Sequence, residues 1–81
     1  MKTVYQTEGT CSKFIEIETR DNIVGDVKFY GGCDGNLKGI ASLIKGMTID
    51  EVISRLEGIH CGNKTTSCPD QLCRALKEMK Q

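Results

Sequence analysis

Residues 14–30, FIEIETRDNIVGDVKFY, predict the first half of the fold. In residues 15–18 isoleucine alternates with glutamate, which is the period of a strand with one buried face. Residues 20–22, Arg-Asp-Asn, supply turn chemistry. A second alternating set follows the turn: Ile23, Gly25, Val27 and Phe29. The pattern predicts a β-hairpin, and residues 4–6 add a shorter third strand to give a small antiparallel meander with one polar face.

The hydrophobic period becomes helical after residue 36, and three helical segments follow. A glycine ends each of the first two segments, and a hydroxyl side chain caps the start of each of the last two: these are Gly46, Gly58, Thr48 and Ser67. The third segment runs from about Cys68 to Met79. Strands followed by helices predict a single α+β domain over residues 1–81, with three helices packed on one face of the sheet.

Length and charge limit the function classes. A chain of 81 residues buries only roughly 60% of its unfolded surface, so a thin core and an open sheet edge are compatible with a homodimer. Lys plus Arg and Asp plus Glu both number 11, which argues against nucleic acid or a membrane surface as a partner. The N-terminal residues lack the apolar run of a signal peptide. We therefore expect a cytoplasmic protein.

Five cysteines without an export signal are expected to be thiols rather than disulfides. Cys68 stands directly before Pro69, between Ser67 and Asp70, whose spacing is that of a capping box. Cys68 is then the first residue of a helix, where the helix dipole favours the thiolate and can lower a cysteine pKa from about 8.5 to about 3.5–7.5. The same position, four residues before Leu72, also suits a buried packing thiol.

Three cysteines lie beside glycine or at a helix start, where the backbone can approach an ion or ligand closely: Cys33, Cys61 and Cys68. Their thiolates and one further ligand predict a tetrahedral zinc site, although no C-x-x-C knuckle is present. The candidates for the further ligand are His60, Cys73 and Asp70.

Two alternatives to zinc remain open. In the first, the chain is a thiol-redox protein in which Cys68 is catalytic and Cys33 or Cys61 is its resolving partner. In the second, it is a protein-interaction domain whose thiols are buried and inert. Cys11 and Cys73 are interpreted as packing thiols, and His60 as a structural residue. The glycine-rich run over residues 31–39 lacks the GK[ST] ending of a P-loop, so a turn and helix cap is favoured over a phosphate cradle.

Three segments together resemble the TSCPD domain family over nearly the whole chain: GGCDGNL at 31–37, HCGNK at 60–64 and TSCPDQLC at 66–73. Cys33, Cys61 and Cys68 match the family pattern. Other matching positions serve as candidate ligand-binding residues for a metal or nucleotide: Gly31, Gly32, Asn36, Ser67 and Asp70.

The resemblance also implies a functional setting. TSCPD domains occur as small stand-alone proteins and near the C-terminus of adenosylcobalamin-dependent ribonucleotide reductases. The implied function is an accessory cysteine-cluster module for a ribonucleoside-diphosphate reductase, or another nucleotide enzyme, in deoxynucleotide synthesis. A chain of 81 residues cannot enclose the barrel and the radical chemistry of the reductase, so the partner would supply them.

Overall fold

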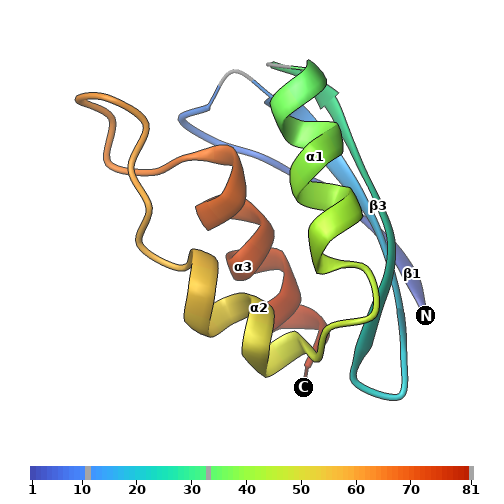
Figure 1. The fold of residues 1–81 in the computed structure, drawn as a ribbon. Helices are drawn as coiled ribbons and strands as arrows, with labels where there is room; N and C mark the ends of the chain where they lie inside the picture. The colour runs from blue at the N-terminus through green and yellow to red at the C-terminus, as the bar shows by residue number, and fades with distance from the viewer. Residues whose placement is uncertain (11, 33, 81) are drawn as a thin grey trace.

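The computed structural model describes residues 1–10, 12–32 and 34–80. A three-stranded antiparallel sheet of order β1-β2-β3 is followed by three helices, which lie on one side of it (Figure 1). The elements are β1 (Lys2–Gln6), β2 (Ser12–Arg20), β3 (Ile23–Gly31), α1 (Asp34–Ile44), α2 (Ile49–Leu56) and α3 (Cys68–Met79). The predicted α+β class, with a meander followed by three helices, is confirmed. None of the helices in these described ranges is long and apolar enough to cross a membrane.

The hairpin turn forms because two residues tolerate the left-handed backbone region. Asp21 and Asn22 have φ of 50° and 69°, and short polar side chains make that region accessible to non-glycine residues. Ile15 then pairs with Phe29, and Ile17 pairs with Val27. Both isoleucines are fully buried beneath the helices, as their alternation predicts.

One detail of the predicted strand pattern is wrong. Ile23, assigned to the buried set of β3, is 37% exposed, whereas its neighbour Val24 is fully buried. The cause is a register shift between Ile17 and Thr19, after which Thr19 pairs with Val24 and both side chains are buried. A bulge of this kind reverses the side to which the following residues point, and period-two alternation does not reveal it.

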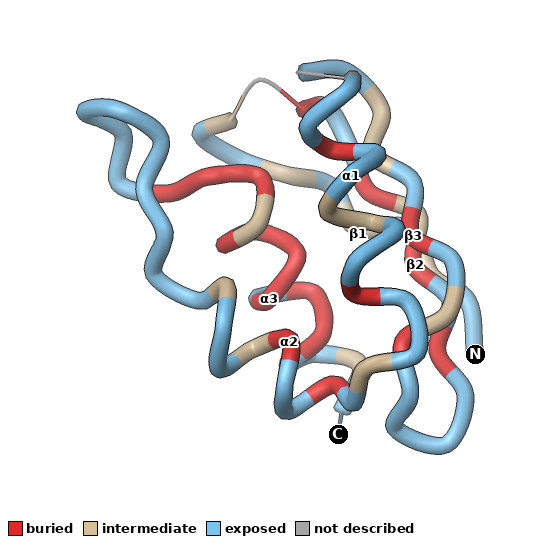
Figure 2. The backbone as a smooth tube through the Cα atoms, in the orientation of Figure 1, coloured by how far each residue is buried: buried red, intermediate tan, exposed pale blue. Residues whose placement is uncertain are grey.

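The core lies between the sheet and the helices. Buried residues of β2 and β3 meet buried residues from the helices, chiefly of α3, in one cluster: Ile15, Ile17, Val24, Val27, Ile44, Ile49, Val52, Leu72, Ala75 and Leu76. Most of α3 is buried, whereas the segment between α2 and α3 projects away from the core (Figure 2). Residues 57–65 are all exposed. The chain becomes buried again at Thr66, immediately before α3.

Candidate functional site

Helix α3 begins as the sequence predicts, with Ser67 as its N-cap. The Ser67 hydroxyl accepts a hydrogen bond from the Asp70 N–H at 3.2 Å and donates one to the Ile59 carbonyl at 2.6 Å. Cys68 is then the first helical residue, and Pro69 follows in the first turn, where a missing N–H has no cost. Ser67 therefore both starts the helix and holds the preceding loop against it.

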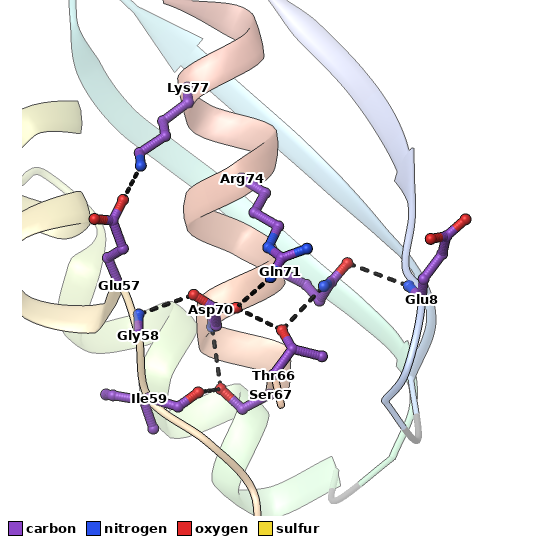
Figure 3. A network of polar contacts seen from close by, with 10 residues as sticks. All are labelled: Glu8, Glu57, Gly58, Ile59, Thr66, Ser67, Asp70, Gln71, Arg74 and Lys77. Atoms are coloured by element: carbon purple, nitrogen blue, oxygen red, sulfur yellow. Dashed lines mark hydrogen bonds and ion pairs between the residues drawn. The ribbon is translucent and has the colours of Figure 1, made fainter. Parts of the chain in front are cut away.

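The Asp70 carboxylate does not complete the predicted capping box. Its Oδ1 accepts a hydrogen bond from the Gly58 N–H at 2.8 Å, and its Oδ2 accepts one from the Thr66 hydroxyl at 2.5 Å (Figure 3). The Arg74 guanidinium lies 3.4 Å from the same Oδ2. Burial by itself would raise the pKa of Asp70, but the Thr66 and Gly58 hydrogen bonds and the Arg74 and His60 charges outweigh it, so the pKa is lowered.

Gln71 extends this network to the sheet. Its Nε2 donates to the Thr66 hydroxyl at 3.0 Å, and its Oε1 accepts from the Glu8 N–H at 3.2 Å (Figure 3). The next residue, Gly9, has φ of 74°, and a Cβ added there would lie 3.2 Å from Thr66 Cγ2. Within the described residues, no buried side-chain nitrogen or oxygen lacks a hydrogen-bond partner. Thr66, Ser67, Asp70 and Gln71 thus form one buried polar network, here called the polar lock, which joins α3 to the end of α2 and to the segment after β1.

Cys68 lies at the edge of this lock and takes a different partner. Its side chain is buried, with the residue 7% exposed, and its Sγ is 2.6 Å from Ser12 Oγ, where either atom can donate. Ser12 is itself buried at the start of β2 and pairs with Gly31 at the end of β3. The start of β2 therefore meets the start of α3.

Cys61 lies in the exposed segment but is folded back toward the same helix start. Its backbone N–H donates to the Thr66 carbonyl at 3.1 Å, and its own carbonyl accepts from the Lys64 N–H at 3.0 Å. These two bonds close a turn that places Cys61 beside the residues that precede α3. The Cys61 thiol remains exposed, in contrast to that of Cys68.

A cavity of about 170 Å³ lies at the start of α3, and both Cys61 and Cys68 line it. Its apolar wall comes from Leu37 and Ile40 of α1 and from Pro69. The other lining residues are polar or charged: Thr10, Asn36, Lys64 and Ser67. Four of the residues predicted from the sequence are therefore brought to one place: Asn36, Cys61, Ser67 and Cys68.

Other predicted site residues lie elsewhere. Gly31 and Gly32 are exposed at the end of β3 and adopt φ of 88° and 79°. Asp70 belongs to the polar lock and is not among the residues that line the cavity. Cys33 lies outside the described residues, and so does Cys11. Among the residues that are described, no group of three His, Cys, Asp or Glu side chains could hold a metal ion.

Cys73 behaves as a packing thiol. It is fully buried, and its Sγ faces the Val52 carbonyl at 3.7 Å across the α2–α3 interface. Burial, reinforced by the negative charges of Asp70 and Glu57, raises the pKa of Cys73 to about 12. The thiol therefore stays protonated at physiological pH and is a poor nucleophile.

Sequence reasoning missed Ser12, which is 56 residues from Cys68 in the chain. Extending the alternation back from Ile15 predicts that residue 13 points inward. A register shift between Ser12 and Phe14 instead buries Ser12 and exposes Lys13. No local signal in the sequence reveals this bulge.

The TSCPD domain family model matches residues 1–80. The chain belongs to the TSCPD domain family. No curated protein and no solved structure matches it. In this TSCPD domain, the five letters of the motif separate into two roles. Thr66, Ser67 and Asp70 build the polar lock, whereas Cys68 and Pro69 line the cavity, together with the Ser67 that caps the helix.

Proposed function

We propose that this TSCPD domain is an accessory thiol module, in which Cys61 and Cys68 form a dithiol that exchanges with a disulfide of a larger enzyme. The observation that carries the proposal is that both thiols line one cavity at the start of α3. A dithiol exchange needs only two cysteines, and the described residues supply both at this cavity. The buried Cys73, held protonated, is not suited to take part.

The difference in solvent exposure between the two thiols indicates the order in which they react. The exposed Cys61 thiolate attacks one sulfur of the partner's disulfide, so that a mixed disulfide forms and the second partner sulfur leaves as a thiolate. Cys68 then attacks the Cys61 sulfur, which closes a Cys61–Cys68 disulfide and releases the first partner thiolate. Two electrons pass to the partner, and its two thiolates take up the protons that Cys61 and Cys68 lose. The sequence hypothesis gave Cys68 the first role, but its burial favours the resolving one.

The position of Cys68 supports that resolving role. It is the first residue of α3, where the helix dipole stabilises a thiolate, and the Ser12 hydroxyl lies 2.6 Å from its sulfur. A hydroxyl that donates to a thiolate makes a charge-assisted hydrogen bond. The Ser12 hydroxyl is thus placed to donate to the Cys68 sulfur while that sulfur attacks the Cys61 sulfur of the mixed disulfide.

The partner is proposed from the family resemblance. By the resemblance, TSCPD domains also occur near the C-terminus of adenosylcobalamin-dependent ribonucleotide reductases, so we propose a ribonucleotide reductase, or another nucleotide enzyme, as the larger enzyme whose disulfide is reduced. The link to deoxynucleotide synthesis is part of this proposal. The 81-residue chain would act as a separate accessory part and would not carry the reductase chemistry itself.

Zinc binding is the second candidate. It is favoured by the position of Asn36, which lies three residues after Cys33 and lines the same cavity as Cys61 and Cys68. Structural zinc takes four ligands, with thiolates at about 2.3 Å. The described residues offer two thiols at the cavity, so this candidate requires Cys33 as a third ligand.

One experiment separates these candidates. Zinc per chain is measured on untagged protein purified without chelator, and thiols are counted before and after denaturation. The dithiol proposal expects no stoichiometric zinc and rapid alkylation of Cys61 in the folded state. It also expects a reversible Cys61–Cys68 disulfide after mild oxidation, found by peptide mapping and retained in Cys73→Ala.

Two results would contradict the dithiol. Stoichiometric zinc with three thiols protected until unfolding would establish the zinc module. No zinc, no Cys61–Cys68 disulfide and slow alkylation would leave the interaction domain with inert thiols.

A further inference from the structure

The cavity beside the two thiols is too small for a nucleotide-sized ligand. It holds about 170 Å³, whereas pockets for small molecules and cofactors span roughly 300–1,000 Å³. A space of this size suits one large side chain. Side chains that anchor a protein complex commonly fill a pocket of this kind on the partner surface.

The lining defines the chemistry of that side chain. Leu37 and Ile40 from α1 and Pro69 from α3 present an apolar wall directly beside Cys68. An apolar side chain that enters the cavity is removed from contact with water, and this burial of apolar surface is the main source of its binding free energy. Thr10 and Asn36, also at the cavity, carry a hydroxyl and an amide that can bond to the backbone of an extended segment.

The positive charge of Lys64 indicates a second feature of the partner segment. Lys64 lines the same cavity and is exposed, and in the described part of the chain no ion pair engages its ammonium group. The nearby carboxylate of Asp70 is already taken by Gly58, Thr66 and Arg74. An acidic residue next to the apolar side chain would therefore find a positive charge at the cavity without a competing partner.

We infer that the cavity receives one large apolar side chain of the partner protein, next in its chain to the disulfide-bonded cysteine, and that Lys64 pairs with an acidic residue beside it. This inference rests on the proposed dithiol function, because it describes the partner segment whose disulfide the dithiol would reduce. The apolar side chain seats the partner so that its disulfide lies against Cys61. Recognition and reaction then use neighbouring residues of one cavity.

Short peptide disulfides test this inference. The probe is the symmetrical disulfide of acetyl-Asp-Phe-Cys-amide, and its matched probes replace Phe by Ser or Asp by Lys. The reduced protein is mixed with each probe, and the rate of peptide thiol release is measured, with Cys61→Ser as the blank. We expect the Asp-Phe probe to react about tenfold or more faster than the Asp-Ser probe.

Variants locate the preference in the cavity. Ile40→Ala should reduce the Phe-over-Ser preference several-fold, and Lys64→Glu should make the Lys-Phe probe faster than the Asp-Phe probe. Lys13→Glu, an equal charge change on the exposed side of β2, is the control and should leave both preferences unchanged. If Ile40→Ala fails to fold by circular dichroism, the exposed Lys64→Glu decides alone.

The outcomes separate this inference from the proposed function. Equal rates for the Phe and Ser probes, both faster than with free cysteine, would overturn the inference and leave the dithiol intact. Preferences that persist in both cavity variants would overturn it as well. Rates no faster than those of free cysteine for every probe would instead remove the dithiol function.

Discussion

Helices α2 and α3 begin with the same local signal and use it differently. Thr48 caps α2 by accepting from the Glu51 N–H at 3.1 Å, and Ser67 caps α3 in the same way through Asp70. The Glu51 side chain is 50% exposed and lies near Arg55, whereas the Asp70 side chain is 7% exposed and is enclosed by the polar lock. A capping signal thus starts both helices, but only at α3 is the signal buried, and there its residues also make tertiary contacts.

Around α3, the residues that stabilise the fold are different from the thiols that line the cavity. The polar lock holds the exposed segment 57–65 at both ends, through Gly58 and Ile59 on one side and Thr66 on the other. Cys61 is therefore exposed, while both ends of its segment are hydrogen-bonded at the start of α3. Helix α2 has no comparable segment before it, because a short turn over Gly46 and Met47 leads directly to its cap.

Removal of the Asp70 carboxylate has the largest expected effect on the difference between α2 and α3. Asp70→Ala leaves the Gly58 N–H and the Thr66 hydroxyl without their acceptor in a buried place, so we expect a loss of about 3 kcal/mol in the free energy of unfolding. Glu51→Ala, at the matched position of α2, should cost about 0.5 kcal/mol or less. Urea denaturation measures both. Similar losses for the two variants would show that the lock adds nothing to an ordinary cap.

Thr66→Val tests the lock with almost no change in shape. It removes the hydroxyl that donates to Asp70 and accepts from Gln71, and we expect a loss of about 2 kcal/mol. Thr65→Val, at the exposed neighbouring residue, is the control and should change stability by less than about 0.5 kcal/mol. Hydrogen exchange of the Gly58 N–H should quicken only in Thr66→Val. An unchanged rate there would argue against a continuous network.

The hydroxyls of Thr48 and Ser67, the two N-caps, differ in the number of hydrogen bonds they make. Replacing an N-cap hydroxyl by Ala costs typically about 1 kcal/mol, which we expect for Thr48→Ala. Ser67→Ala also removes the hydrogen bond to the Ile59 carbonyl, so its loss should be greater by about 0.5–1 kcal/mol. Thermal unfolding of both variants gives the difference. An equal loss would mean that the Ile59 contact does not contribute.

The dependence of stability on pH gives the smallest expected effect. Because the pKa of Asp70 is below its usual value of 3.8, its contribution is present above that pH and is lost as pH falls through the lowered value. The difference in unfolding free energy between the parent and Asp70→Asn should therefore shrink on acidification. Asp26→Asn is the control. The hydrogen bond from Lys45 also lowers the pKa of Asp26, but Asp26 lies on the open surface. A constant Asp70→Asn difference down to pH 2 would contradict the assignment.

Several features follow from local sequence alone. The alternation of isoleucine and glutamate in β2, the Asp21-Asn22 turn and the caps at Thr48 and Ser67 each depend on residues a few positions apart, and the structure shows all of them. Family membership likewise follows from motifs in the chain. The α+β order of elements needs no more than these periods and caps.

The site needed contacts that no local pattern encodes. Ser12 reaches Cys68 only because a bulge in β2 turns it inward, and Gln71 reaches the Glu8 N–H from 63 residues away. The Ser67 cap and Pro69 are enough to predict where α3 begins and that Cys68 stands at its first position. That Cys61 shares a cavity with Cys68, and that the Asp70 carboxylate is buried in the polar lock, could not be predicted, because burial and long-range hydrogen bonds depend on how distant segments pack.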